Sequence, residues 1–118
     1  MISKEKYDYI ICGAGASGLL LSNSMINDDF FNDKKILIIE KDKKNENDKT
    51  FGFWENKKSL LDELVFKEWE YAEFKDSSFH NSFRLEPFKY KMIKSSKFYS
   101  HIGKKISKAS NFTYLNSN

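Results

Sequence analysis

Three glycines and one glutamate are the residues of this sequence whose types and spacing could bind a ligand. Gly13, Gly15 and Gly18 form a G-x-G-x-x-G pattern, and Glu40 follows the last of them by about 20 residues. In that order, these residue types are typical of a turn that holds a pyrophosphate and of an acid that accepts the hydroxyls of a ribose. The spacing therefore predicts a site for the ADP half of a dinucleotide cofactor.

Each position of the pattern has its own physical reason. Gly13 allows the tight turn out of a strand, Gly15 lets the backbone approach the pyrophosphate, and Gly18 lets the helix pack closely on the strand. The helix that follows offers unpaired N–H groups and a partial positive charge to the phosphates. A glutamate at position 40 disfavours a 2′-phosphate, so NADPH is the less favoured ligand. The predicted cofactor-binding residues of this unit are Gly13, Ala14, Gly15, Ala16, Ser17, Gly18, Glu40 and Lys41.

The elements that must position these residues are two apolar strands and a helix. Tyr7–Cys12 and Lys35–Glu40 are short apolar runs of the kind that forms buried parallel strands. Between them, Leu19–Ile26 has the pattern of a helix. Cys12 is expected to be a small buried residue of the first strand. The arrangement predicts a right-handed βαβ unit over residues 7–41.

Residues 42–89 predict a loop followed by an antiparallel β excursion. The polar stretch 41–49 is expected to be a solvated loop. Apolar and charged residues alternate from Val65 to Phe74, which is typical of a half-exposed strand with Trp69 and Tyr71 on one face. A turn at 76–78 then leads into a partner strand at Phe79–Leu85. The acidic side chains of this region, such as those of Asp62 and Glu68, are expected to be solvated.

Residues 90–115 predict a strand, a helix and a strand. Tyr90–Lys94 is the first strand, and Ser95 or Ser96 is an N-cap for a helix over residues 97–107. Phe112–Leu115 is a candidate for a third parallel strand. One face of the helix is expected to carry Phe98, Ile102 and Ile106.

Together these elements predict an α/β fold. We interpret it as the N-terminal part of a Rossmann-like FAD/NAD(P)-binding domain of the glutathione-reductase type, with the antiparallel excursion placed after the second strand. The position of the βαβ unit at the start of the chain and the long excursion favour FAD over NAD, by analogy with two-domain flavoproteins. At 118 residues, the chain is expected to be the first part of a longer protein that contains the rest of the cofactor and substrate domains.

Composition and charge exclude several classes of function. The net charge is +3 and acidic residues are interleaved with the basic ones, so no nucleic-acid partner is expected. A single cysteine, Cys12, fits a reducing cytosol, and no apolar stretch approaches the roughly 18 residues of a membrane span. His80 and His101 lack partners at metal-ligand spacing, so no metal site is assigned. A cytoplasmic location is expected.

The stretch DKTFGFWE, residues 48–55, is more specific than a general nucleotide-binding pattern. Together with YDYIICGAGASGLLLS before it and PFKYKMIKSSKFYSHI after it, it resembles the lycopene cyclases, in particular the β-cyclases of Bacteroidetes-type carotenoid producers. Those proteins have N-D-R-T-W-x-F-W and Y-K-M-I-R segments at the corresponding places. Lys49 and Lys94 stand where the family commonly has arginine, and Phe51 stands where it commonly has tryptophan. Lysine keeps the charge but lacks bidentate geometry.

The resemblance implies a flavoprotein that closes the ends of lycopene into β-ionone rings, an acid-catalysed isomerisation with no net redox change. It implies reduced FAD as the cofactor, with NAD(P)H as its reductant. Thr50 joins the implied cofactor-binding residues, and residues 50–54 would lie near the flavin or the substrate channel. The insoluble substrate favours peripheral docking of the full-length protein on a membrane. No catalytic residue is assigned, because the resemblance implies that the acids important to cyclisation lie well past residue 118, and residues 1–118 alone are expected to be inactive.

Two alternatives to the isomerase stay open. A redox flavoprotein of the same fold, such as a monooxygenase, halogenase or prenyl reductase, would share the glycine turn and Glu40. A non-catalytic nucleotide-binding fragment would share them as well. For the aromatic residues Phe51, Phe53 and Trp54, packing in a core competes with contact to the polyene and its carbocation.

Overall fold

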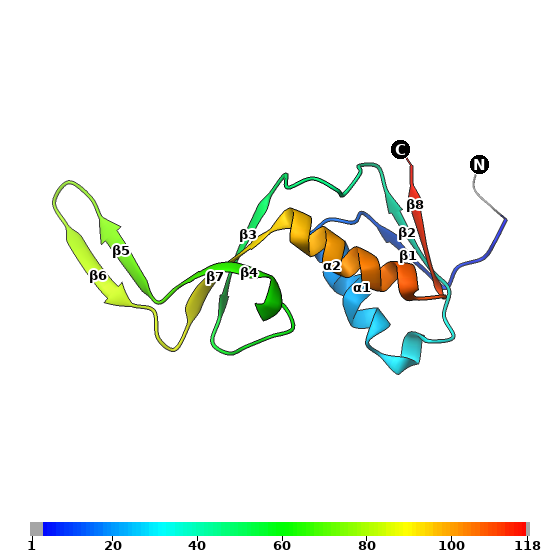
Figure 1. Ribbon diagram of the computed structural model, residues 1–118, viewed down its shortest axis with the longest axis horizontal. Coiled ribbons are helices and arrows are strands. Elements are labelled where there is room, and N and C mark those ends of the chain that lie inside the picture. Colours follow the sequence, from blue (N-terminus) through cyan, green and yellow to red (C-terminus); the bar gives the residue numbers. More distant parts are fainter. Residues whose placement is uncertain (1–3, 118) are drawn as a thin grey trace. The chain divides into compact units, whose positions relative to one another are not determined.

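The computed structural model describes residues 4–117, which form two compact units. Residues 4–46 and 99–117 make up the parallel unit, and residues 47–98 make up the antiparallel unit (Figure 1). The boundary between the units falls inside the second α-helix. The elements in chain order are β1 (Tyr9–Cys12), α1 (Ala16–Ile26), η1 (Asp29–Phe31), β2 (Ile36–Glu40), β3 (Thr50–Glu55), η2 (Asp62–Leu64), β4 (Val65–Trp69), β5 (Tyr71–Lys75), β6 (His80–Arg84), β7 (Lys89–Lys94), α2 (Ser95–Lys108) and β8 (Phe112–Asn116).

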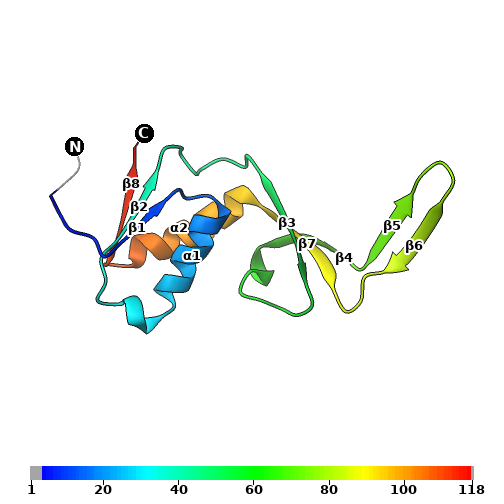
Figure 2. The same cartoon turned by 180° about the vertical axis from the view of Figure 1, so that it is seen from behind.

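The parallel unit contains the predicted βαβ arrangement. Strands β1, β2 and β8 form one sheet in the order β1-β2-β8, and both pairings are parallel. Figures 1 and 2 show β2 between its two neighbours, with α1 connecting β1 to β2. The α/β class and the third parallel strand at the predicted position are therefore confirmed.

The core of the parallel unit is centred on β2. Ile36, Leu37 and Ile38 are buried, since helices and neighbouring strands cover this middle strand. Helix α1 adds the buried side chains of Leu19 and Met25. Complete burial of an isoleucine side chain such as Ile36 stabilises the fold by about 2 kcal/mol.

The first strand differs from the prediction. Only Ile11 of β1 is buried, whereas Ile10 is 56% exposed and Cys12 is exposed. The prediction of a buried strand with Cys12 as a buried residue is therefore wrong. The reason is that, within the described residues, β1 is an edge strand that pairs only with β2 and contributes one face to the core.

The antiparallel unit contains a three-stranded sheet and a hairpin. The sheet order is β3-β7-β4, and both pairings are antiparallel. Strands β5 and β6 pair with each other across the predicted turn, in which the Asp76 carboxylate accepts the N–H groups of Ser78 and Phe79. The single strand predicted over Val65–Phe74 is wrong, because it breaks at Glu70 into β4 and β5, which join different sheets.

Helix α2 begins two residues earlier than predicted, at Ser95. The Ser95 hydroxyl accepts the Lys49 N–H and donates to the Asp48 carboxylate, and the Ser95 N–H donates to the Lys49 carbonyl. These contacts fix the start of the helix against the segment that leads into β3. No helix within residues 4–117 is long and apolar enough to cross a bilayer. The three residues predicted for the apolar face are all buried: Phe98, Ile102 and Ile106.

Candidate cofactor site

The glycine turn joins β1 to α1, and two of its glycines are required by the fold itself. Gly13 has φ = +109°, a backbone conformation that residues with a Cβ rarely adopt. Its N–H donates to the Ile39 carbonyl at 2.7 Å, which ties the turn to β2. A Cβ on Gly18 would collide with the Gly13 carbonyl oxygen, so Gly18 is needed for helix and strand to pack closely.

Gly15 differs from the other two because neither its backbone conformation nor a neighbouring atom requires a glycine there. A Cβ at Gly15 would meet no atom within 4 Å, and its backbone needs no positive φ. Gly15 is also the N-cap of α1, and no side chain caps the helix there. The first N–H groups of a helix lack intrahelical partners. The turn therefore presents an open, electropositive helix end beside a glycine that packing does not require.

Glu40 connects the end of β2 to this turn. Glu40 is 7% exposed, and its carboxylate accepts the Ala14 N–H at 2.6 Å and the Asp42 N–H at 2.9 Å. The hydrogen bond from Asp42, then that from Ala14, and the charge of Lys44 hold the pKa of the Glu40 carboxyl below its usual value, although burial opposes them. Glu40 is therefore ionised at neutral pH and has oxygen lone pairs left for further donors.

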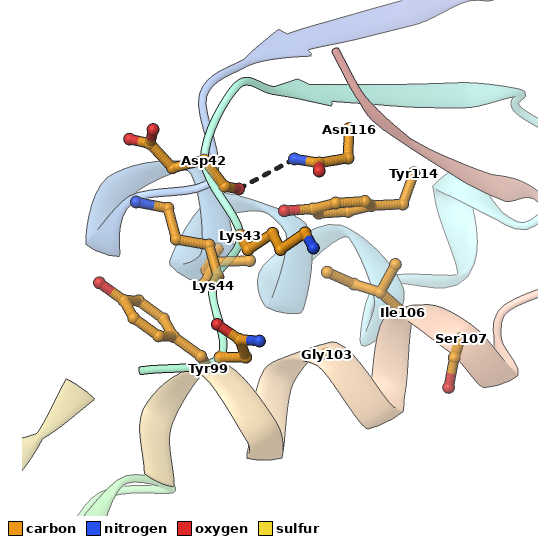
Figure 3. Close-up of a pocket in the computed structure, with 11 residues that line it drawn as sticks. Asp42, Lys43, Lys44, Tyr99, Gly103, Ile106, Ser107, Tyr114 and Asn116 are labelled. Atoms are coloured by element: carbon orange, nitrogen blue, oxygen red, sulfur yellow. Dashed lines mark hydrogen bonds between the residues drawn. The ribbon is translucent and has the colours of Figure 1, made fainter. Parts of the chain in front are cut away.

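A cavity of about 460 Å³ lies at this end of the parallel sheet (Figure 3). Its volume is within the usual range of small-molecule sites. The Asn116 amide donates to the carbonyls of Glu40 and Asp42 and so links β8 to the chain after β2. The lining residues come from α1, the loop after β2, α2 and β8: Leu19, Asp42, Lys43, Lys44, Asn45, Tyr99, Gly103, Ile106, Ser107, Tyr114 and Asn116.

Aromatic and cationic side chains share the wall of this cavity. Lys44 Nζ lies 5.5 Å from the centroid of the Tyr99 ring and 4.0 Å from a Glu40 carboxylate oxygen. Burial, together with the Glu40 charge, raises the pKa of the Tyr114 hydroxyl. The cavity thus combines flat apolar surfaces with a positive charge held beside a carboxylate, an arrangement that suits a planar polar ring.

The loop after β2 is the part of the site that sequence reasoning missed. It was expected to be solvated throughout, but the Lys44 side chain is only 15% exposed because it packs against Tyr99 and Glu40. The spacing of Lys44 four residues after Glu40 was the available signal. Lys41 is exposed. Thr50 begins β3 in the antiparallel unit, so its role at the cofactor stays a prediction.

Metal ligands are not gathered in the described part of the chain. Within residues 4–117, no group of three His, Cys, Asp or Glu side chains could hold a metal ion. His80 Nε2 lies 2.7 Å from a Glu73 carboxylate oxygen on the exposed β5–β6 hairpin.

Comparison with known proteins adds a family to this geometry. Residues 8–118 match the family model described as "Lycopene cyclase protein", which therefore covers both units and the whole candidate site. No curated protein sequence matches the chain.

Proposed function

The chain belongs to the lycopene cyclase family, and from this premise we propose that it forms the ADP-binding part of an FAD site in a lycopene β-cyclase. Membership of the family supports a carotenoid cyclase with a carotenoid substrate. The proposal adds three finer statements. The cofactor is FAD, the fold is a Rossmann-like domain of the glutathione-reductase type, and the reaction is an isomerisation that leaves the substrate's oxidation level unchanged.

The observation that carries the proposal is the open space at Gly15. Gly13 and Gly18 are explained by backbone conformation and packing, but Gly15 has no such reason within the described structure. A ligand that approaches the backbone at this point would supply the reason. The pyrophosphate of a dinucleotide fits, because the N–H groups at the start of α1 bind anions.

The other residues of the site fit the remainder of an ADP group. The ionised Glu40 would accept the ribose hydroxyls in addition to the N–H groups it already holds. The cavity beside it would take the adenine, against the Tyr99 and Tyr114 rings. When bound and reduced, by NAD(P)H in our proposal, FAD supplies an electron-rich ring that stabilises positive charge. The chain's own residues bind and orient the cofactor, and we assign none of them as the proton donor.

A test of the reaction is pigment chromatography in bacteria that accumulate lycopene. The complete open reading frame that encodes this chain would be expressed in these bacteria. We expect the protein to act in the cytoplasm, at the membrane surface. Conversion of lycopene to β-carotene, with γ-carotene as the half-cyclised intermediate, is the expected result. Unchanged lycopene in cells that hold soluble, flavin-loaded protein would overturn the cyclase proposal, and oxidised or reduced carotenoid products would favour a redox enzyme.

A test of the site is FAD binding by a Gly15→Val variant. A Cβ at position 15 meets no protein atom within 4 Å in the described structure, so we expect the variant to fold while its FAD affinity falls at least a hundredfold. Ser24→Val is the matched control, because Ser24 is an exposed residue of the same helix. Fluorescence titration with FAD measures affinity, and circular dichroism checks folding. Equal FAD affinity in the two variants would contradict the assignment.

A further inference from the structure

Three aromatic side chains form a continuous row across the antiparallel sheet. Trp54 of β3 lies directly opposite Tyr90 of β7, and Tyr90 lies directly opposite Trp69 of β4. The ring centroids are 4.9 Å apart for Trp54 and Tyr90 and 5.9 Å apart for Tyr90 and Trp69. Trp54 is 57% exposed. This aromatic row therefore crosses all three strands and is open at its β3 end.

Gly52 explains how the row keeps its geometry. A Cβ at Gly52 would collide with the hydroxyl of Tyr90, so the Tyr90 side chain occupies space that any other residue at position 52 would fill. Gly52 and Trp54 are two residues apart on β3 and share a face of the sheet. The glycine between the aromatic residues of TFGFW thus gives Tyr90 room beside Trp54.

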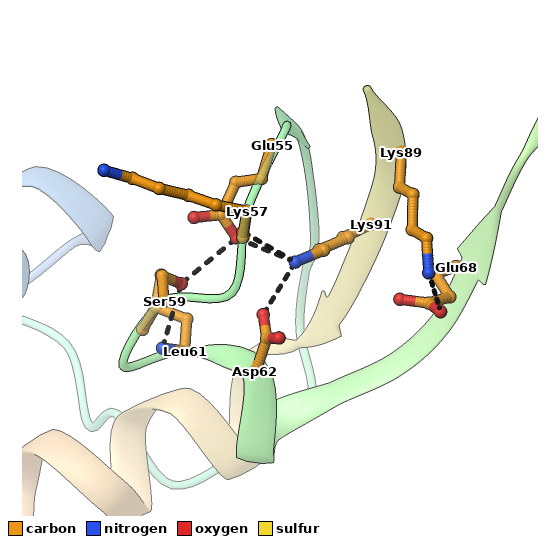
Figure 4. Close-up of polar contacts among 8 residues, drawn as sticks. All are labelled: Glu55, Lys57, Ser59, Leu61, Asp62, Glu68, Lys89 and Lys91. Carbon is orange, nitrogen blue, oxygen red and sulfur yellow. Dashed lines mark hydrogen bonds and ion pairs between the residues drawn. The ribbon is translucent and has the colours of Figure 1, made fainter. Parts of the chain in front are cut away.

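The opposite face of the same sheet is charged. Lys91 is buried, and its ammonium lies 2.7 Å from the Asp62 carboxylate and 3.3 Å from that of Glu55 (Figure 4). Lys89 pairs with Glu68 at 3.0 Å. Asp62 and Glu68 were expected to be solvated: Glu68 is exposed, whereas Asp62 is half-buried beside Lys91. Because residues 89 and 91 alternate with residue 90 along β7, these charges point away from the aromatic row.

On the face of the sheet that carries the aromatic row, the charged residues are Lys67 and Lys94. Each of them lies over an aromatic ring. Lys67 Nζ lies 5.3 Å from the centroid of Trp69, and Lys94 Nζ lies 3.9 Å from that of Phe66. The ring faces therefore already stabilise positive charge here. None of the described strand residues on this face is an aspartate or glutamate. The face therefore exposes aromatic rings, whereas the opposite face of the sheet is occupied by ion pairs.

We propose that the aromatic row is a binding surface for the conjugated chain of a linear polyene. This inference rests on the proposed function, which supplies a carotenoid as the substrate. Three rings across two strand spacings extend over roughly 10 Å, which matches a straight segment of a conjugated hydrocarbon. Such a ligand needs apolar contact and ring faces rather than hydrogen bonds. A flavin ring needs several hydrogen-bond donors and acceptors, whereas the polar atoms of the row are one tyrosine hydroxyl, placed over Gly52, and two indole N–H groups.

The test is binding of all-trans-retinol, a short fluorescent polyene, to the full-length protein. We expect Trp54→Ala to weaken retinol binding about tenfold and Trp54→Phe to restore most of it. Tyr71→Ala is the matched control, because Tyr71 is 58% exposed and lies outside the row on β5. Retinol's own fluorescence measures affinity in all variants.

Each outcome decides the inference. A weaker affinity in Trp54→Ala with an unchanged affinity in Tyr71→Ala supports the row. Equal effects of the two substitutions, or no effect of Trp54→Ala in folded protein, would overturn it. A loss of FAD affinity in Trp54→Ala with unchanged retinol affinity would assign the row to the cofactor instead. Since the assay needs no turnover, failure of the row and failure of the cyclase reaction are seen separately.

Discussion

The two units bury their middle strands in different ways. In the parallel unit, four of the five residues of β2 are buried, and three of them are the consecutive apolar residues Ile36, Leu37 and Ile38. In the antiparallel unit, β7 also has a neighbour on each side, but its burial alternates, and one buried position is the charged Lys91. The difference teaches that a continuous apolar run needs cover on both faces, whereas an antiparallel strand can keep one face for other chemistry.

The units also differ in the range of their contacts. The turn, α1 and β2 of the parallel unit come from one continuous stretch, so a short motif specifies the glycine turn and Glu40, while α2 and β8 complete the cavity. In the antiparallel unit, Thr50 pairs with Lys94 and Trp54 with Tyr90, residues far apart in the chain. The aromatic row therefore depends on strand pairing that no local pattern indicates. The following substitutions test these two modes of construction separately.

The largest effect is expected from Gly18→Ala in the parallel unit. The new methyl group would collide with the Gly13 carbonyl oxygen, which is backbone and cannot move aside easily. We expect a loss of about 3 kcal/mol in the free energy of unfolding. Urea unfolding measures this loss, and hydrogen exchange locates it. Faster exchange confined to peptides from residues 47–98 would contradict the assignment of the effect to the parallel unit.

Lys91→Met tests the antiparallel unit. The Asp62 hydrogen bond and the Glu55 charge raise the pKa of Lys91 against the effect of burial, and removal of the ammonium leaves both carboxylates uncompensated. We expect a loss of about 2 kcal/mol at neutral pH. Because the folded pKa is raised, this stabilisation is complete below the unfolded pKa of about 10.4 and disappears as the pH rises through the folded value.

Lys89→Met is the control for Lys91→Met. Its ion pair with Glu68 is well exposed, so little change in stability is expected. Urea unfolding of both variants at neutral pH and above pH 11 makes the comparison. An effect of Lys89→Met as large as that of Lys91→Met would show that burial of the ion pair is not the cause.

Glu40→Gln tests the link between β2 and the glycine turn. The Ala14 and Asp42 N–H groups bond to different oxygens of the carboxylate. A glutamine would accept one of these N–H groups and turn its own NH2 group toward the other. We expect a loss of about 1.5 kcal/mol at neutral pH. The pKa of Glu40 is lowered in the folded protein, so its stabilisation is present above about pH 4.3 and disappears as the pH falls through the folded value. Stability measured against pH should therefore lose part of its acid dependence in the variant.

The smallest effect is expected from Gly103→Ala in α2. A Cβ there would meet no atom within 4 Å, and alanine favours a helix more than glycine does. We expect a gain of about 0.5 kcal/mol in the free energy of unfolding, measured by thermal unfolding. A loss would show that Gly103 needs its backbone freedom or the space in the cavity wall.

The pattern of apolar and polar residues did not predict where one strand ends or which strand residues are buried. Val65–Phe74 mixes apolar and charged residues throughout and contains no glycine or proline, so nothing local indicates that the chain leaves one sheet at Glu70 and begins a hairpin. Likewise, Tyr7–Cys12 ends in the apolar residues of a strand, but its place at the sheet edge leaves Ile10 and Cys12 exposed. In both cases the number of neighbours that a strand acquires is decided by distant parts of the chain.

The sequence by itself determined the glycine turn, the helix after it, Glu40 at the end of the second strand and the third parallel strand. These features depend on backbone conformation and on short-range apolar patterns, which residue types specify directly. Only the tertiary structure decided that Gly15 faces open space, that Lys44 is held between Tyr99 and Glu40, and that Trp54, Tyr90 and Trp69 share one row. The reason is physical, since empty space, burial and cross-strand neighbours are properties of segments brought together by folding.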